Sequence, residues 1–386
     1  MTFNFSALLS CLADNNMFQN KKIVASRRVR PTHFSKRVEA AGVQTYTCYN
    51  HMLLPAEFES VEADYWHLCE HVQVWDVSVE RQVQLLGPDA ARLAQLMTPR
   101  DLSNAQPLQG KYAPMCDSQG RILNDPVVIN LTEEKWWVSL ADSDIKLWAK
   151  GLAEGFGLDV QVSEPDVSPL AVQGPKAEKL MQRVFGNEVS DIRFFWGKML
   201  PFKGHDMYVA RSGWSKQGGF EIYVDNSELA VPLWDALFEA GADLEVRAGC
   251  PNQIERMESG LLSYGSDMDE YDTVFECGLD SFLNLNADVE SLSLPALRKL
   301  KSQQTRKLFG VLFPQKMPFN MSYGMLEQGA PYEMRSHAWS PRYNKHMTHI
   351  MLPLSFASEN EYLLVDGVRG KITGIPFTKE LLESHE

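Results

Sequence analysis

The sequence lacks the features that mark membrane-spanning, disulfide-rich and nucleic-acid-binding proteins. No apolar run reaches the roughly 18 residues that a membrane helix needs. The six cysteines form no CxxC pair, which argues against a zinc site or a disulfide framework and favours reduced thiols in the cytoplasm. A net charge of -13 offers no basic stripe for a phosphate backbone, so we expect no nucleic-acid partner. The composition, 44% hydrophobic over 386 residues, predicts a soluble globular chain with about two or three domains.

Common catalytic signatures are also missing. Neither GxGxxG nor GxxxxGK(S/T) occurs, and neither GxSxG nor HExxH, so we expect no phosphate loop, serine elbow or zinc-protease helix of these types. His67 and His71 are four residues apart, which we interpret as a solvated helix face. Asp267 and Asp269 lack the distal Glu of a calcium loop. We therefore expect no metal site.

The N-terminal segment combines weak hydrophobicity with a later cluster of positive charge. Residues 1–20 are weakly apolar, but the basic residues Lys21 and Lys22 follow this stretch instead of preceding it, unlike a signal peptide. We expect residues 1–20 to be a disordered extension. The basic run over 21–37 has two interpretations, a solvated arm or a segment that lines an anion-binding site.

Hydrophobic periodicity predicts a mixed α+β fold followed by a β-rich end. The expected helices are 60–75, 89–97 and 176–185, and the expected strands are 81–86, 126–131, 135–140, 308–313, 361–366 and 369–374. The segments GPDA (87–90) and GPKA (174–177) look like equivalent strand–turn–helix corners of two related units. We therefore expect two intertwined α+β units over 21–290 and an all-β C-terminal domain over 300–386.

The densest chemical pattern is RSGWSKQGGFEIYV, residues 211–224. A Gly-Gly turn leads into a strand whose alternation places Glu221 and Tyr223 on one face. The apolar residues Phe220, Ile222 and Val224 should then occupy the other face. A carboxylate at this place can accept two N–H groups of a heterocycle, although an edge-strand glutamate in water has the same pattern.

Two further segments leave functional alternatives open. Ile254, Met257, Leu261 and Leu262 predict a helix that ends at Tyr264-Gly265. The pair Asn124-Asp125 precedes a proline and is either a turn or a polar pair that faces a ligand. Among the nine tryptophans, Trp137, Trp196 and Trp214 are candidates for an aromatic box around an onium cation, against the alternative that each packs in the core.

In order along the chain, these motifs resemble the folate-dependent aminomethyltransferase family, which includes the glycine-cleavage T-protein. The resemblance covers roughly residues 26–386 and rests on HVQVWDVS (71–78), YAPMCDSQGRILND (112–125), RSGWSKQGGFEI (211–222), ERMESGLLSYGSD (255–267), FECGLDSF (275–282) and RSHAWSPRYNK (335–345). The chain is most similar to a demethylase branch of that family, through SRRVRPTHF (26–34), YTCYNHMLLP (46–55) and GCPN (249–252). Where the T-proteins carry a first Asp, this chain has Asn124, and a plain methyl transfer needs no acid there.

The resemblance implies a three-domain ring of two α+β units and a C-terminal barrel-like β domain, with tetrahydrofolate in the central channel. It implies methyl transfer from dimethylsulfoniopropionate to tetrahydrofolate, which is the methyl-accepting cosubstrate. Glu221 would bind the pterin, Tyr223, Trp214 and Tyr264 would wall the site, and Asn124 and Asp125 would lie at the reacting centre. We further expect donor contacts from the aromatic residues Phe34 and Trp196 and from the basic residues Arg28 and Arg30.

Other activities within this resemblance stay open. One is that of the glycine-cleavage aminomethyltransferase itself, which Asn124 disfavours. Another is demethylation of a different onium or methylamine osmolyte. A folate-binding iron–sulfur assembly factor is a third, although its KGC-type signature is replaced here by SGLLSYG (259–265). We expect no membrane partner, and the sequence leaves a homo-oligomer open.

Overall fold

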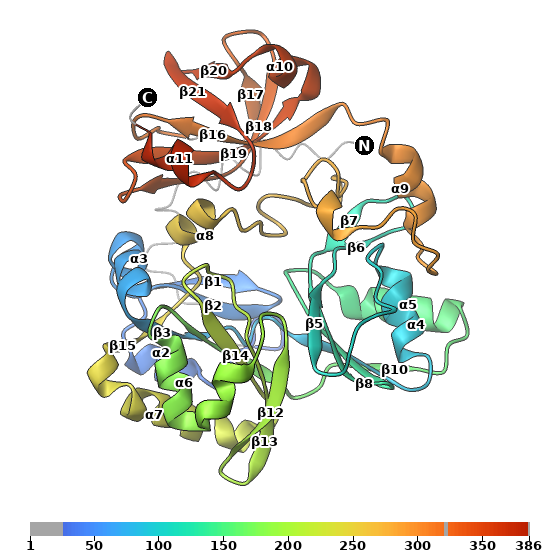
Figure 1. Cartoon of the computed structure of the whole chain (residues 1–386), viewed down its shortest axis with the longest axis vertical. Coiled ribbons are helices and arrows are strands. Elements are labelled where there is room, and N and C mark those ends of the chain that lie inside the picture. Colours follow the sequence, from blue (N-terminus) through green and yellow to red (C-terminus); the bar gives the residue numbers. More distant parts are fainter. Residues whose placement is uncertain (1–25, 320–322, 385–386) are drawn as a thin grey trace.

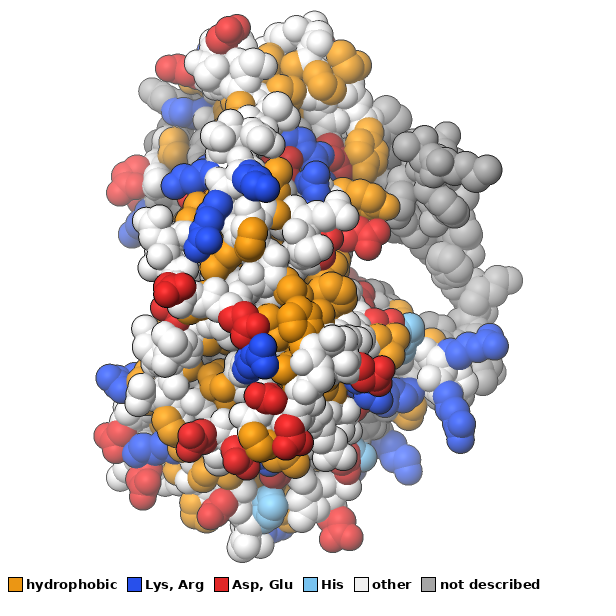
Figure 2. All heavy atoms as spheres, turned by 90° about the vertical axis from the view of Figure 1, so that its right-hand side faces the viewer, with side chains coloured by type: hydrophobic (Ala, Val, Ile, Leu, Met, Phe, Trp, Pro, Cys, Tyr) orange, Lys and Arg blue, Asp and Glu red, His pale blue; other side chains and the backbone are white. Residues whose placement is uncertain are grey.

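The structure is a computed structural model that describes residues 26–319 and 323–384. The expectations for residues 1–20 and for Lys21 and Lys22 lie outside this part of the chain. Three lobes, each built on one sheet, meet around a common centre (Figure 1). Seen from the right-hand side of that view, hydrophobic side chains gather near the middle of the molecule, with charged side chains above and below (Figure 2). No helix in the described residues is long and apolar enough to cross a membrane.

The first lobe contains a six-stranded sheet in the order β12-β13-β14-β11-β3-β15. Its strands are β3 (Val72–Asp76), β11 (Ser168–Gln173), β12 (Gly197–Phe202), β13 (His205–Ala210), β14 (Gly219–Val224) and β15 (Val246–Gly249). One face packs against three helices, α2 (Ser35–Ala40), α6 (Ala177–Phe185) and α7 (Ala230–Ala240), in the largest core cluster. The other helix of this lobe, α3 (Val61–Glu70), precedes β3, and the hairpin β1 (Thr45–Tyr49) and β2 (Met52–Glu57) lies beside the lobe (Figure 1).

The second lobe contains a five-stranded sheet in the order β10-β4-β9-β8-β5. Its elements are β4 (Gln82–Leu86), α4 (Ala90–Met97), β5 (Gln109–Tyr112), β8 (Val127–Thr132), β9 (Lys135–Ser139), α5 (Ile145–Gly155) and β10 (Gln161–Ser163). A short pair, β6 (Met115–Cys116) and β7 (Ile122–Asn124), leads from this lobe toward the centre (Figure 1). The predicted hairpin around residues 132–134 is confirmed, because β8 and β9 pair antiparallel there.

The third lobe follows α8 (Gln253–Ser259) and α9 (Leu294–Leu300) and contains a curled antiparallel sheet in the order β17-β18-β19-β16-β21-β20. Its strands are β16 (Arg306–Phe313), β17 (Tyr323–Met325), β18 (Pro331–Ser340), β19 (Lys345–Pro353), β20 (Tyr362–Val365) and β21 (Val368–Thr373). Two short helices, α10 (Leu354–Glu359) and α11 (Lys379–Glu383), accompany these strands. The sequence analysis predicted an all-β segment and missed both helices.

The two predicted glycine corners are present and equivalent. Gly87 joins β4 to α4 with φ +139°, and Gly174 joins β11 to α6 with φ +121°. A Cβ atom would lie 2.6 Å from the Asp159 carbonyl oxygen at the first corner and 2.4 Å from the His71 carbonyl oxygen at the second. Both corners therefore require glycine for its conformation and for the close approach of another backbone.

Two predicted helices are shorter than expected. The helix expected over 60–75 ends at Glu70, and Val72–Asp76 forms the fully buried strand β3, because its apolar residues continue on both faces of a central strand. The helix expected to reach Tyr264 ends at Ser259, where Gly260 adopts the left-handed conformation with φ +65°. Beyond Gly260 the chain leaves the helix and continues as a loop at the centre of the molecule.

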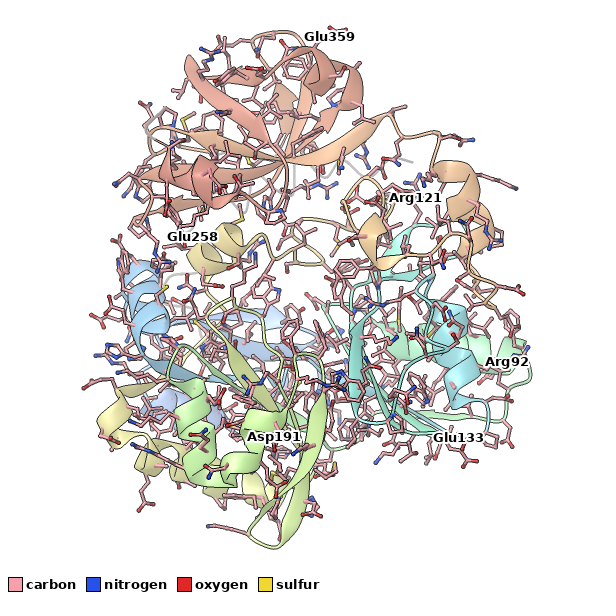
Figure 3. The ribbon with its side chains drawn as sticks, viewed as in Figure 1. Arg92, Arg121, Glu133, Asp191, Glu258 and Glu359 are labelled. Carbon is pink, nitrogen blue, oxygen red and sulfur yellow. The ribbon has the colours of Figure 1, made fainter. Side chains whose placement is uncertain are left out.

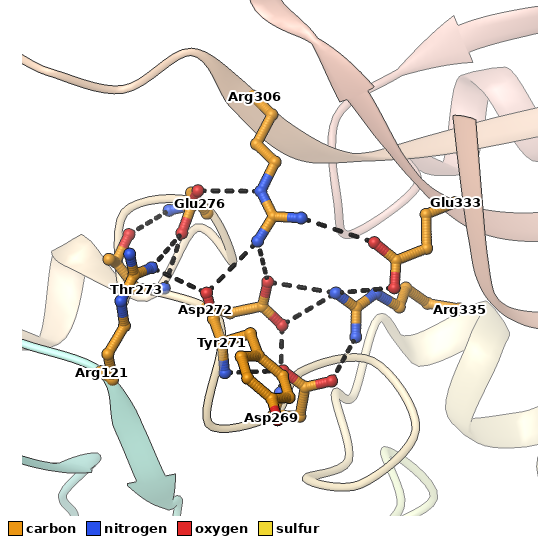
Figure 4. Close-up of polar contacts among 9 residues, drawn as sticks. All are labelled: Arg121, Asp269, Tyr271, Asp272, Thr273, Glu276, Arg306, Glu333 and Arg335. Carbon is orange, nitrogen blue, oxygen red and sulfur yellow. Dashed lines mark hydrogen bonds and ion pairs between the residues drawn. The ribbon is translucent and has the colours of Figure 1, made fainter. Parts of the chain in front are cut away.

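Ion pairs fasten this loop to the third lobe. Arg306 contacts Asp272 at 2.8 Å and Glu276 at 3.0 Å, and Arg335 contacts Asp272 at 3.0 Å (Figure 4). Arg121, which immediately precedes β7, donates to the Tyr271 carbonyl oxygen at 2.7 Å, so the second lobe joins the same network. The loop therefore has a defined place between all three lobes.

A separate contact fastens the first lobe to the third. Glu258 on α8 lies at the boundary between them (Figure 3). It accepts hydrogen bonds from Tyr65 of α3 and from Ser340 of β18, at 2.8 and 2.6 Å.

Candidate functional site

A cavity of ≈ 840 Å³ lies where the three lobes meet, and residues from each lobe line it. Its size is within the usual range for a small-molecule site. The aromatic residues of the lining are Tyr49, Tyr112, Phe194, Phe195, Trp214, Tyr223, Tyr264, Phe282 and Phe309. The acidic residues are Glu80, Asp125, Asp142 and Glu221, and the basic residues are Arg256 and Lys307. We call this space the central cavity.

Glu221 reaches the central cavity from β14, as the predicted alternation requires. Phe220 and Ile222 pack in the core on the opposite face of the strand. Ser212 Oγ donates a hydrogen bond to Glu221 Oε2, and the Tyr223 hydroxyl lies 3.5 Å from the same oxygen. Burial raises the pKa of Glu221, and these two donors oppose the rise. The second oxygen, Oε1, has no partner among the described residues, so this carboxylate can accept N–H groups of a ligand.

Trp214 lies in the cavity wall on a loop whose conformation is closely constrained. A Cβ atom on Gly213, which has φ +144°, would lie 1.9 Å from Gln173 Nε2. Gln173 in turn accepts a hydrogen bond from Ser215 at 2.9 Å, and Glu255 accepts one from the Lys216 backbone at 2.9 Å. The loop is thus fixed on both sides of Trp214, which can present a rigid aromatic face.

A buried group of three hydrogen-bonded side chains supports the same wall from behind. Asp267 lies 2.7 Å from Arg256 and 2.8 Å from His349 of β19, and the Asp267 and His349 side chains have no exposed surface. Burial opposes ionisation, but Arg256 and His349 hold the pKa of Asp267 well below its usual range. The Arg256 guanidinium lies 5.6 Å from the Trp214 ring centre, and Asp267 also accepts from the Ser263 backbone at 2.9 Å. The third lobe therefore helps to place Trp214 and the segment that carries Tyr264.

Asp125 is the acidic group of the cavity best suited to exchange a proton near neutral pH. The Tyr112 hydroxyl donates to Asp125 Oδ2 at 3.0 Å. Burial raises the pKa of Asp125 to about 7, although the bond from Tyr112 opposes this rise. A group with this pKa is half protonated at neutral pH and can act as an acid or a base.

Two acidic residues of the cavity were missed by the sequence analysis. Burial, together with the nearby charges of Glu221 and Asp125, raises the pKa of Glu80 well above its usual value. Asp142 accepts a hydrogen bond from the Asn50 backbone at 2.7 Å. Glu80 could have been noticed because it ends the segment DVSVE, where the chain departs from the family pattern DVSHM. Asp142 carries no comparable signal.

Asn124 lies beside the central cavity but is not part of its lining. Its amide donates to the Ala141 carbonyl oxygen at 3.0 Å and to Ser143 Oγ at 2.8 Å, and its oxygen accepts from the Ala141 backbone at 3.0 Å. The side chain is fully buried. Asn124 therefore holds the segment that contributes Ala141 and Asp142 to the cavity wall.

The other expected donor contacts lie away from the central cavity. Phe34 is fully buried in the core of the first lobe, 5.9 Å from the Trp234 ring. Trp196 packs against the same core, with the Arg193 guanidinium 4.2 Å from its ring centre. Arg28 is exposed, and Arg30 pairs with Glu164 at 2.9 Å beside a different cavity. The donor contact through residues 26–34 was inferred from an aromatic residue close in sequence to a basic run. The structure instead places Phe34 in a core and Arg30 beside a different cavity.

Of the three candidate tryptophans, only Trp214 belongs to the cavity lining. Trp137 stacks on Tyr223 at 5.9 Å and so supports a residue of the wall without reaching the cavity. Tyr223 and Tyr264 are both part of the lining of the central cavity.

Comparison with known families and sequences gives consistent results. The family described as "GCVT N-terminal domain" matches residues 34–287. Over 266 residues the chain is 60% identical to the dimethylsulfoniopropionate demethylase DmdA of Ruegeria pomeroyi. The aligned residues are 69% of this chain and 73% of the relative. Over 326 residues the chain is 28% identical to an aminomethyltransferase of Desulfitobacterium hafniense. This alignment includes 82% of this chain and 88% of the relative.

Comparison with solved structures confirms the fold. The glycine cleavage system aminomethyltransferase T from Bartonella henselae superposes with a TM-score of 0.79 at 19% identity, over 91% of this chain and 98% of that one. The α+β class predicted from the sequence is therefore confirmed, together with a curled C-terminal sheet.

Proposed function

The chain belongs to the family defined by the GCVT N-terminal domain, and from that premise we propose that it is a tetrahydrofolate-dependent methyltransferase that demethylates dimethylsulfoniopropionate. The observation that carries this proposal is the 60% identity to the Ruegeria pomeroyi demethylase, compared with 28% for the aminomethyltransferases. The products are methylthiopropionate and 5-methyltetrahydrofolate.

The central cavity fits tetrahydrofolate as the methyl acceptor. Glu221 offers an unpartnered carboxylate oxygen to the N–H groups of a pterin, through charge-assisted hydrogen bonds. Trp214, Tyr223 and Tyr264 provide faces for its rings. The cosubstrate supplies the amine that accepts the methyl group, and the chain's own residues bind it and exclude water.

The lining also fits a donor with a positive charge. Four carboxyl groups line the cavity, while Arg256, one of its two basic residues, is already paired with Asp267. Burial and the charges of Glu221 and Asp125 raise the pKa of Glu80, and a cation bound beside Glu80 would oppose this rise. Aromatic faces add about 0.5–2 kcal/mol each for a sulfonium.

The chemistry asks little of the protein beyond alignment. In the donor the bond between the methyl carbon and sulfur breaks, and its electron pair stays on sulfur, so a neutral thioether leaves without a general acid. Holding donor and acceptor in line supplies on the order of 7–11 kcal/mol. Asp125, with its pKa raised to about 7, can take up the proton that the accepting amine releases.

We propose the remaining assignments on the same basis. The folate-binding region spans residues 21–290 and the C-terminal domain spans 300–386, with Asp125 at the reacting centre and Asn124 as its structural neighbour. The described cysteines are all free thiols, which favours the reducing cytoplasm as the site of the reaction.

The test is to incubate the purified protein with tetrahydrofolate and dimethylsulfoniopropionate and to follow 5-methyltetrahydrofolate by mass spectrometry. Parallel reactions contain trimethylsulfonium, glycine betaine, or an aminomethylated glycine-cleavage H-protein. We expect turnover with dimethylsulfoniopropionate to exceed that with the other donors by at least about tenfold. Preferred turnover of the H-protein would instead establish an aminomethyltransferase, and preferred turnover of glycine betaine would establish a different osmolyte demethylase.

A further inference from the structure

Glu80 differs from the other acidic residues of the central cavity because its carboxylate has no partner in the protein. Each of the other three accepts a hydrogen bond, from a side chain or from the backbone. Among the described residues, no donor reaches the Glu80 side chain and no cation pairs with it. Glu80 lines the cavity and is only partly buried, so this carboxylate is available to a ligand.

The charges that act on Glu80 all have its own sign. Burial raises the pKa of Glu80 well above its usual value, and the charges of Glu221 and Asp125 raise it further. Of the two basic residues in the cavity lining, Arg256 is paired with Asp267, and neither contributes to the pKa of Glu80. A positive charge is therefore what a ligand can add at this place.

Tyr49 provides an aromatic face close to Glu80. It packs against the small core cluster that contains Val79, the residue before Glu80. The turn that follows Tyr49 is fixed to the same segment, because Asn50 Nδ2 donates to the carbonyl oxygens of Val79 and Ala141, both at 3.0 Å. Both Tyr49 and Glu80 line the central cavity, so an aromatic ring and a carboxylate border the same part of it.

This combination suits a sulfonium better than a group that donates hydrogen bonds. The sulfur of a dialkylated sulfonium bears no hydrogen, so it offers charge without directed donors. A carboxylate attracts such a charge strongly in a cavity that excludes water, and aromatic faces attract onium groups. Glu221, which is oriented by its own donors, is the better acceptor for the N–H groups of a pterin.

We propose that Glu80, beside the face of Tyr49, binds the sulfonium end of the methyl donor and makes the protein select a cationic donor over a neutral one of the same shape. This inference rests on the proposed function and deepens it, because it assigns the donor's positive charge to one carboxylate. The alternative is that Glu80 serves as a second acceptor for the pterin.

Glu80 should act on donor binding more than on the transfer step. The positive charge passes from the donor sulfur to the accepting amine and stays within the cavity, so the carboxylate stabilises the bound donor and the transition state to a similar degree. Glu80→Gln should therefore raise the KM for dimethylsulfoniopropionate at least about tenfold, with a change in kcat below about threefold.

The direct test compares dimethylsulfoniopropionate with 4-methylpentanoate, which has the same carboxylate and shape but a CH group in place of the charged sulfur. Isothermal titration calorimetry measures both ligands in the presence of folic acid, whose oxidised pterin accepts no methyl group. The wild type should prefer the sulfonium, and Glu80→Gln should lower the ratio of the two affinities at least about tenfold. Glu80→Asp keeps the charge and should preserve most of the preference.

Two control variants show whether the effect belongs to Glu80. Asp142→Asn removes another carboxyl group of the lining, one that already accepts a backbone hydrogen bond, and should change the preference by less than about threefold. Glu239→Gln, at an exposed position on α7, should leave it unchanged. Equal losses in Asp142→Asn and Glu80→Gln would mean that the whole cavity selects the cation, and that result overturns the proposal.

The pH dependence of the wild type provides a second test that needs no folded variant. Sulfonium affinity should fall as pH drops through the raised pKa of Glu80, and the affinity for 4-methylpentanoate should not. Glu221 and Asp125 titrate in the same cavity, whereas Tyr49 and Tyr223 stay protonated because burial and acidic neighbours raise their pKa values. Equal pH profiles for the two ligands overturn the proposal.

The remaining outcomes separate this inference from the proposed function. An unchanged ratio of affinities in Glu80→Gln, or a loss of tetrahydrofolate affinity alone, overturns the inference. A lower melting temperature with equal losses for both ligands would mark a structural role and overturns it too, because a carboxylate without donors should not support the fold. Absence of both binding and turnover of dimethylsulfoniopropionate in the wild type overturns the proposed function instead.

Discussion

Replacement of Glu221 by Gln should weaken tetrahydrofolate binding and stabilise the free protein at the same time. Glu221 lines the central cavity with one oxygen that has no partner among the described residues, and its pKa is raised by burial. Removing its charge costs the charge-assisted part of the pterin contact, about 1.5–3 kcal/mol, or a roughly 10- to 150-fold rise in Kd. Removing a buried charge should also raise the melting temperature, because the ionised carboxylate opposes folding.

The effect of Glu221 on the stability of the protein should depend on pH. The pKa of Glu221 is higher in the folded than in the unfolded chain, so its destabilising effect grows as pH rises from about 4 through the raised pKa. The melting temperatures of Glu221→Gln and wild type should therefore converge near pH 4 and differ most above the raised pKa. Folate affinity of the wild type should fall as pH drops through the same range, and that of the variant should not.

Calorimetry of tetrahydrofolate binding and differential scanning fluorimetry measure the two effects. Glu239→Gln is the matched control, because Glu239 is an exposed glutamate on α7 outside the central cavity. A Kd within about twofold of wild type, below 0.5 kcal/mol, would remove Glu221 from the folate site. A weaker Kd with a lower melting temperature would mean that Glu221 supports the fold and that its effect on binding is indirect.

Four further substitutions test the other assignments. Asn124→Asp should lose about 1–3 kcal/mol of unfolding free energy in urea, because its amide donors are buried and bonded, and it should create no glycine-cleavage activity; a large gain there would favour the T-protein activity. Trp214→Leu should raise the KM for the sulfonium more than twofold at unchanged melting temperature, and an unchanged KM would exclude its aromatic face from the donor site. Tyr112→Phe removes a bond that lowers the pKa of Asp125, so the acid limb of the pH–rate profile should lie at higher pH than in the wild type; a limb at the same pH would show that Asp125 does not carry the proton. Phe34→Ala should cost about 3–5 kcal/mol of stability with an unchanged KM, and a raised KM would return this residue to the donor site.

Local sequence pattern predicted the features of the fold that depend on nearest neighbours. The alternation after Gly218-Gly219 predicted which face of β14 carries Glu221, because strand geometry alone decides it. The glycine corners at 87 and 174 were visible because each combines a turn signal with the start of an apolar helix. The buried strand at 72–76 was not visible, since its apolar residues also fit a continued helix.

The composition of the cavity depends on contacts that no local pattern contains. Asp125 follows β7 in the second lobe, Glu221 lies in the first, and Glu80 lies on the segment between β3 and β4. Only the sheet order brings these carboxyl groups to one space. The expected donor contact of Phe34 and Arg30 was inferred partly from their adjacency. The structure separates them, because Phe34 is buried in a core and Arg30 lines a second cavity together with Arg81 and Glu164.

The buried triad has a consequence for how the molecule assembles. Asp267 follows α8, and its partner His349 comes from a strand 82 residues later. Until β19 docks, Asp267 has only Arg256 to offset the loss of hydration, and a half-paired buried carboxylate is costly. The loop with Ser263 and Tyr264 can therefore take its final course only when the end of the chain has folded onto it. During synthesis the binding cavity should be the last part of the protein to close, so an incomplete chain would bury most of its cores while remaining unable to hold its ligands.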